Sequence, residues 1–182
     1  SALDAALRTQ LRDELAQLLR NFGITAIFVT HDQNEAMAIA DRVAVMSHGK
    51  VAQIGTPEAL YRNPDTAFVA RFVGDAQPLV GRIEGNMLYL QGGKLPLSRA
   101  AEGHQAFVRA EDIRLEPQGP LCAKVEAVTF LGAHYRIALT GAAKETLFAL
   151  YGGLNAPSPG DTVRLAIAPQ SILTLPVDKE VA

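Results

Sequence analysis

The sequence predicts an α/β first half followed by a smaller all-β second half. Residues 24–29 (ITAIFV) form an apolar, β-branched run without polar alternation, which is typical of a strand covered on both faces in a parallel sheet. Amphipathic, helix-like patterns stand on both sides of that run. After residue 76 the helical spacing stops, and short β-rich segments alternate with Gly, Pro and Asn. We therefore expect two domains, residues 1–76 and residues 77–182.

Within residues 1–76, the leucines before Gly23 recur at helical spacing, so the first element is a helix with Asp4 as its expected N-cap. Gly23 is the expected stop of that helix. Further helices are expected over residues 33–41, from Thr56-Pro57-Glu58, and after Asn63-Pro64-Asp65. Strands over 42–47 and 51–54 should pair as a hairpin through the turn Ser47-His48-Gly49-Lys50.

Within residues 77–182, the even spacing of short strands predicts a small closed or nearly closed β-barrel. The expected strands are 80–84, 87–90, 94–97, 106–109, 113–116, 122–130, 135–140, 146–151, 162–168 and 172–175.

Composition narrows the function classes. The net charge of −2 gives no electrostatic reason to expect a nucleic-acid partner. The single cysteine, Cys122, excludes an intrachain disulfide and a cysteine-cluster metal site, and it favours a reducing compartment. No two of the four histidines have a metal-ligand spacing, so no metal site is expected. No apolar run is long enough to span a bilayer, and the chain opens on Ser1 without a methionine, as in a processed chain or a piece of a longer one.

His31 is the residue best placed for chemistry. It follows the apolar run 24–29, and ligands of parallel sheets lie beyond the carboxyl ends of the strands. An imidazole at that place can bond a phosphate oxygen or an attacking water. It can equally cap the next helix or bond a neighbour, and spacing alone leaves these two readings open. Ser1-Ala2-Leu3-Asp4, taken alone, reads as the start of a helix.

Both segments occur, in order, in a longer pattern. "SALDAALR", a helix, and "GITAIFVTHDQNEAMAIADRVAVMSHGKVAQIGTPEALYRNP" resemble the end of an ATP-binding subunit of an ABC importer. The second half resembles the accessory, OB-like TOBE domain of these importers, through "AFVRAEDIRL" at 106–115 and "VEAVTFLGAHYRIAL" at 125–139. The first of these segments has Ala110 where the family commonly has proline.

The resemblance implies a fold and roles for particular residues. The fold is the α/β C-terminal piece of a P-loop ABC ATPase domain followed by an all-β domain. His31 is the implied catalytic switch histidine, which meets the γ-phosphate of ATP. Ser1, Ala2, Leu3 and Asp4 are the implied D-loop, a nucleotide-binding segment that crosses the dimer interface. The full-length parent is then an ATPase that uses ATP and Mg²⁺, lies peripherally on the cytoplasmic face of the bacterial inner membrane, and works with a second copy, permease subunits and a solute-binding protein.

The phosphate-binding pattern G-x-x-x-x-G-K-[S/T] and the LSGGQ-type signature are absent from these 182 residues. The family's catalytic glutamate would precede Ser1. We therefore expect this chain alone to bind no cofactor, to be inactive as an ATPase, and to expose apolar surface over residues 24–46.

For the β-rich half, three interpretations stay open: a regulatory and dimerising appendage, a sensor of a small ligand, or, ranked last, a nucleic-acid binder, because the half is neutral and its aromatic residues fall mostly within strands. "FVGDAQPLVGRIEGN" and the short second half most resemble ferric-iron importers, with sulfate and polyamine importers close behind, so iron is the first expected solute and these two stay open. The alternative for the whole chain is a non-catalytic regulatory, ligand-sensing or dimerisation module.

Overall fold

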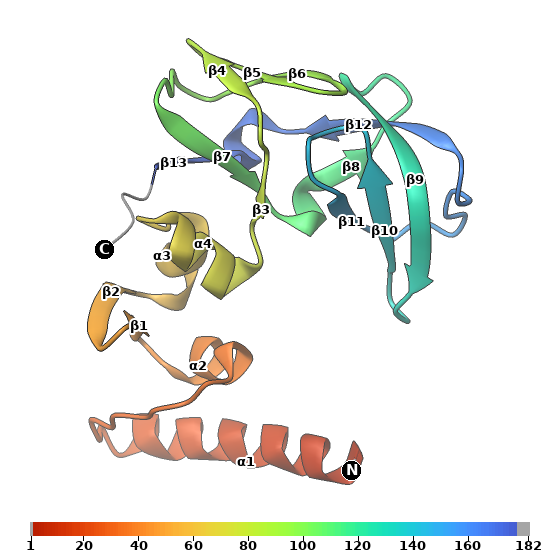
Figure 1. Ribbon diagram of the computed structural model, residues 1–182. Coiled ribbons are helices and arrows are strands. Elements are labelled where there is room, and N and C mark those ends of the chain that lie inside the picture. Colours follow the sequence, from red (N-terminus) through yellow and green to blue (C-terminus); the bar gives the residue numbers. More distant parts are fainter. Residues whose placement is uncertain (1, 178–182) are drawn as a thin grey trace. The chain divides into compact units, whose positions relative to one another are not determined.

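The computed structural model describes residues 2–177, and the chain divides into two compact units, residues 1–64 and residues 65–182 (Figure 1). Helix α4 falls in the second unit, although it precedes the predicted change at residue 76. The domain limits 1–76 and 77–182 stay a prediction. No helix within residues 2–177 has the length and apolarity that a membrane crossing requires.

The first unit begins with α1 (Ala2–Asn21), which ends at the predicted stop. Gly23 takes φ +62°, its N–H donates to the Arg20 carbonyl at 3.2 Å, and the Ile24 N–H donates to the Leu19 carbonyl at 3.0 Å. These two bonds form a Schellman cap, which favours glycine at this position. The expectation that Asp4 caps the helix is wrong, because the helix already begins at Ala2, and alanine and leucine continue a helix readily.

The strand expected over residues 24–29 is not formed, which corrects the sequence prediction. This segment runs between α1 and α2 without a strand arrow (Figure 1), and Ile27 and Val29 are 95% and 90% exposed. A strand in a parallel sheet needs neighbouring strands to pair its N–H and C=O groups, and the described residues supply none here. The expected apolar exposure is confirmed, since Ile24, Phe28 and Met46 are also more than half exposed.

The remainder of the first unit follows the predicted order. Helix α2 (Gln33–Ile39) is followed by the antiparallel hairpin of β1 (Val43–Ser47) and β2 (Lys50–Gly55). His48 and Gly49 form the turn with φ +48° and +73°, which are type I′ values. Helix α3 (Pro57–Arg62) completes the unit.

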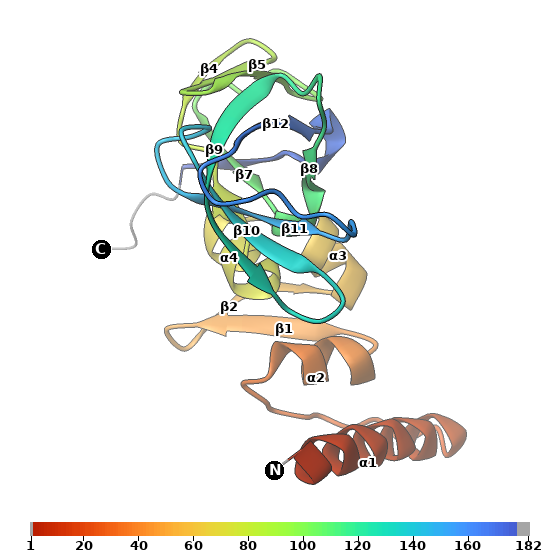
Figure 2. The ribbon, with the colours of Figure 1, turned by 90° about the vertical axis from the view of Figure 1, so that its right-hand side faces the viewer.

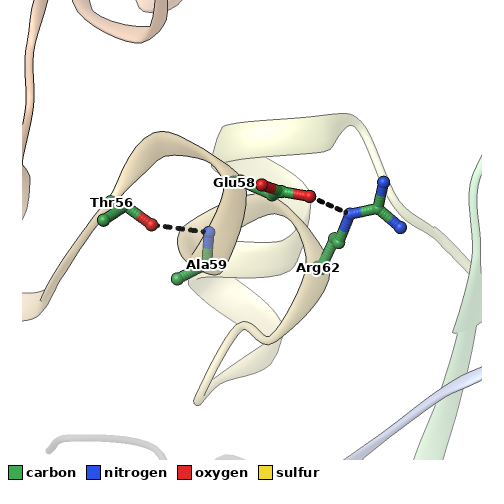
Figure 3. A network of polar contacts seen from close by, with 4 residues as sticks. All are labelled: Thr56, Glu58, Ala59 and Arg62. Carbon is green, nitrogen blue, oxygen red and sulfur yellow. Dashed lines mark hydrogen bonds and ion pairs between the residues drawn. The ribbon is translucent and has the colours of Figure 1, made fainter.

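Helix α3 has an N-terminal cap, a proline in its first turn and an ion pair along its surface (Figure 3). The Thr56 hydroxyl accepts the Ala59 N–H at 3.2 Å, Pro57 occupies the first turn, and Glu58 pairs with Arg62 at 2.9 Å on the exposed side. Cap and proline were both predicted from the sequence, and each satisfies or removes an unbonded N–H at the helix start.

The second unit opens with α4 (Ala67–Gly74), capped by Thr66 and closed by Asp75 at φ +45°. Its small residues pack with Phe107 and Leu175 in a minor core. Arg71 also lies 5.3 Å from the Phe107 ring centre, a cation–π distance. Contacts therefore bind α4 to the β-rich half.

The β-rich half contains two sheets (Figures 1 and 2). The larger follows the order β11-β10-β9-β6-β5-β4, with β12 pairing β9 and β8; the smaller has the order β13-β7-β3. The strands are β3 (Gln77–Pro78), β4 (Arg82–Glu84), β5 (Met87–Leu90), β6 (Gly93–Pro96), β7 (His104–Val108), β8 (Ile113–Leu115), β9 (Leu121–Phe130), β10 (Tyr135–Thr140), β11 (Leu147–Tyr151), β12 (Thr162–Ile167) and β13 (Leu173–Pro176).

One hydrophobic core joins the two sheets. Val108 from the smaller sheet lies in the same cluster as Leu88, Leu121, Ile137 and Leu165 from the larger one. Short 3₁₀ turns, η1 (Ala110–Asp112) and η2 (Pro169–Ser171), precede β8 and β13. The all-β, OB-like character predicted for this half is confirmed, but across the described residues the backbone pairing forms two sheets rather than one closed ring.

Candidate functional site

The candidate site is the short loop Thr30-His31-Asp32, between the exposed apolar segment and α2. Asp32 is the N-cap of α2: its Oδ1 accepts the N–H groups of Asn34 at 2.9 Å and Glu35 at 3.2 Å. This cap ends the extended segment, and α2 starts two residues after His31, at Gln33. His31 thus lies at the bend, and its side chain is exposed.

One reading of His31 left open by its spacing is that it caps the next helix, and the structure bears on that reading alone; the catalytic role stays a prediction. Asp32, not His31, caps the helix. Within residues 2–177, the structure shows no hydrogen bond to the His31 ring, and the residue is exposed. The ring is therefore available to a ligand.

Thr30 and Glu35 add contacts that the sequence analysis missed. The Thr30 hydroxyl donates to Glu35 Oε2 at 2.8 Å and accepts the Asp32 N–H at 3.0 Å. Asp32 at the N-cap with Glu35 three residues later is a variant of the capping-box pattern, and that pattern was the available signal. Glu35 lies in the first turn of α2.

The implied D-loop is described only in part. Ser1 lies outside the described residues, while Ala2, Leu3 and Asp4 form the first turn of α1. Their roles at a nucleotide site stay a prediction.

Other candidate residues do not gather into a site. His48 lies exposed in the predicted hairpin turn, and Cys122 is half-buried in β9. Asp112 lies in η1 and accepts the Ser171 hydroxyl at 2.8 Å, so it has a structural partner. Over the described part of the chain, no three His, Cys, Asp or Glu side chains lie close enough together to hold a metal ion.

The aromatic residues of the β-rich half, which were expected mostly within strands, differ in their burial. Phe107 is fully buried, but Phe130, at the end of β9, is 64% exposed and lies 5.0 Å from the ring of Tyr135. Phe148 is half-buried beneath Arg136, whose guanidinium lies 4.3 Å from the ring centre.

These residues alone do not fit ATP with its Mg²⁺. The chain has no glycine-rich phosphate loop with its lysine, and the described residues have no carboxylate cluster. One exposed histidine at a helix start supplies a single contact of the several that a nucleoside triphosphate needs.

Comparison with known proteins gives the family context. A TOBE domain model matches residues 106–175. The chain is 46% identical over 148 residues to the sulfate/thiosulfate import ATP-binding protein CysA 2 of Chromobacterium violaceum, covering 76% of this chain and 40% of that protein. It is 37% identical over 186 residues to the Fe(3+) ions import ATP-binding protein FbpC of Photobacterium profundum, covering 98% and 53%. It is 45% identical over 141 residues to the sn-glycerol-3-phosphate import ATP-binding protein UgpC of Jannaschia sp., covering 73% and 40%.

Residues 106–175 belong to a TOBE domain, and the whole chain is related to import ATP-binding proteins. It corresponds to the C-terminal part of an ABC importer ATP-binding subunit, as the sequence resemblance implied. The chain spans about half the length of the curated relatives that it matches, from 40% to 53% in those named above. The names of these relatives carry different solutes, so the relatives taken together do not agree on one solute.

Proposed function

We propose that the full-length protein is the ATP-hydrolysing subunit of an ABC importer and that His31 acts at its nucleotide site. The observation that carries this proposal is the place of His31: an exposed ring at the bend between an apolar segment and α2, within a chain that aligns almost throughout with an import ATP-binding protein. Phosphoryl transfer depends mainly on positioning and on stabilising charge. An imidazole N–H directed at a phosphate oxygen contributes to both.

Substitution of His31 in the full-length protein tests this role. We expect His31→Ala to lower kcat for ATP hydrolysis by roughly 10²–10³-fold, the usual effect of removing one such contact, with a smaller change in KM. His48→Ala is the matched control, because His48 is an exposed histidine of the same unit in a hairpin turn. Full turnover by His31→Ala would refute the role.

The 182-residue chain alone is proposed to be inactive. It lacks the phosphate-binding loop, the signature and the catalytic glutamate that the family implies, and it leaves the apolar segment 24–29 exposed. We propose that in the full-length protein this segment joins the parallel sheet of the ATPase domain, which supplies the neighbouring strands that it lacks here. The implied D-loop, Ser1 to Asp4, would then adjoin the nucleotide site.

The partners proposed for the full-length protein are a second copy of itself, membrane permease subunits and a solute-binding protein. Its proposed place is the cytoplasmic face of the bacterial inner membrane. The names of the relatives, which are import ATP-binding proteins, support this assembly. Copurification from membranes tests this assembly. The full-length protein should purify together with its permease and should leave the membrane fraction when the permease is removed.

For the TOBE domain we propose a regulatory and dimerising role. Phe130 and Leu131, at the tip of the β9–β10 hairpin, are 64% and 49% exposed, so this hairpin offers apolar surface outside the core. A ligand-sensing role and a nucleic-acid role are the alternatives. A shift in sedimentation coefficient with protein concentration supports dimerisation, whereas salt-sensitive binding to single-stranded DNA would support the nucleic-acid role.

Ferric iron is the solute that we propose. The relative aligned over 98% of the chain is an Fe(3+) import protein, and the segment FVGDAQPLVGRIEGN resembles that group. Uptake of labelled ferric iron should fall in cells that lack the gene and return on complementation. Loss of sulfate uptake instead would exclude iron.

A non-catalytic module is the second candidate, and the absent phosphate-binding loop favours it for this chain in isolation. A full-length protein that binds no ATP would establish it.

A further inference from the structure

The loop around His31 is tied to α2 on both sides of the histidine. Before it, Thr30 bonds the Glu35 carboxylate through its hydroxyl. After it, Asp32 bonds the first turn of α2 through its carboxylate, and its carbonyl accepts the Ala36 N–H at 3.1 Å. The backbone of residues 30–32 is therefore fixed relative to α2.

The contact between Thr30 and Glu35 differs from a simple capping box. In the simple form, the glutamate at the third helical position accepts the N–H of the N-cap residue directly. Here the Thr30 hydroxyl stands between them: it accepts the Asp32 N–H at 3.0 Å and donates to Glu35 Oε2 at 2.8 Å. The two bonds form a relay that spans His31, and the bond to the carboxylate is charge-assisted.

The relay is partly shielded from water, because Thr30, Asp32 and Glu35 are half-buried while His31 between them is exposed. Hydrogen bonds shielded in this way hold their geometry better than fully exposed ones. The exposed His31 ring therefore extends from a backbone whose neighbouring residues, Thr30 and Asp32, are held by half-buried hydrogen bonds.

We propose that Thr30 and Glu35 are positioning residues for His31. Their relay holds the Cα–Cβ bond of His31 in one direction relative to α2, so that the ring reaches its ligand without first ordering the loop. The catalytic part of this inference rests on the proposed function of His31, whereas the relay itself can be measured without activity.

The first test measures the relay in the whole 182-residue chain. Thr30→Val keeps the side-chain shape but removes both hydrogen bonds, and Thr30→Ser keeps them. We expect hydrogen exchange of the Asp32 amide to become about tenfold faster in Thr30→Val, as its bond is lost, and to stay near the original rate in Thr30→Ser. Glu35→Ala should accelerate it less, because only the second bond of the relay is removed. An unchanged Asp32 rate in Thr30→Val overturns the proposal.

The second test measures turnover in the full-length protein. Thr30→Val and Glu35→Ala should each lower kcat about tenfold with KM for ATP within about twofold, and Thr30→Ser should restore kcat. In a background of His31→Ala, Thr30→Val should cause no further loss, because the relay acts only through that ring. Additive losses would mean a general structural role and would contradict the proposal.

Matched controls come from α3, which has its own capping threonine and first-turn glutamate (Figure 3). Thr56→Val removes a hydroxyl that accepts a backbone N–H, and Glu58→Ala removes a first-turn carboxylate, both at α3 rather than in the loop of His31, so each should leave kcat unchanged. If the original full-length protein has no turnover, the proposed function fails and the exchange test alone decides the relay. If it turns over and only His31→Ala is inactive, the relay proposal fails and the proposed function stands.

Discussion

Gln77 forms the contact whose removal gives the sharpest stability prediction. Strand β11 pairs along one edge with β10, and the Gln77 side chain bonds both the backbone N–H and the backbone C=O of Phe148 in β11. The Gln77 amide N–H donates to the Phe148 carbonyl at 2.8 Å, and the Phe148 N–H donates to the Gln77 side-chain oxygen at 2.6 Å. The side chain thereby replaces a short piece of neighbouring strand, and it joins residues 71 positions apart.

Each of these hydrogen bonds contributes about 1 kcal/mol net, so Gln77→Ala should lower the unfolding free energy of the TOBE-containing unit by about 2 kcal/mol. For a unit of this size the melting temperature should fall by roughly 8 °C. Gln77→Glu keeps the acceptor for the Phe148 N–H but directs a carboxylate at the Phe148 carbonyl. We expect it to destabilise at least as much as alanine at neutral pH.

Thermal and urea unfolding followed by far-UV circular dichroism measure the effect, since the chain has no tryptophan. Gln77→Met preserves length and packing without the hydrogen bonds, so it separates the two contributions. Gln170→Ala, at an exposed glutamine of the same unit, is the control. A loss below about 0.5 kcal/mol in both Gln77→Ala and Gln77→Met would refute the reasoning, because even one net hydrogen bond exceeds it.

Three further changes have defined outcomes. A Cβ at Gly92 would lie 2.2 Å from the Cys122 carbonyl oxygen, so Gly92→Ala should lower the melting temperature strongly, while Gly152→Ala, with open space around it, should not. His48→Asn should stabilise the β1–β2 hairpin by about 0.5 kcal/mol in urea unfolding, because asparagine tolerates positive φ better, and destabilisation would count against the turn geometry. Ile27→Asp should reduce binding of the dye ANS by this chain; unchanged binding would place the exposed apolar surface elsewhere.

The β-rich half and α3 were predictable because their signals are local. Turn residues and strand-forming runs fixed most strand positions to within a few residues, and Thr56-Pro57-Glu58 marked the start of α3 without reference to the remaining chain. The division into two hydrogen-bonded sheets was not predictable in this way, since strand pairing depends on contacts between distant residues.

The segment 24–29 shows the opposite case. Its composition predicts a buried strand, yet burial requires partners that residues 2–177 do not offer, so it stays exposed.

At the candidate site, His31 was found from its place after that segment. The Thr30–Glu35 bond was missed because the spacing of Asp32 and Glu35 predicts a bond from the Asp32 N–H to Glu35. In the structure Glu35 accepts the Thr30 hydroxyl instead, and the spacing does not show this difference.

Calorimetric titration of Mg-ATP tests the central claim most directly, with the 182-residue chain and the full-length protein measured side by side. We expect saturable binding by the full-length protein and no saturable heat from the 182-residue chain, which has His31 but no phosphate-binding loop. Saturable binding of one ATP per 182-residue chain would contradict it, because a complete phosphate site would then have to exist within these residues.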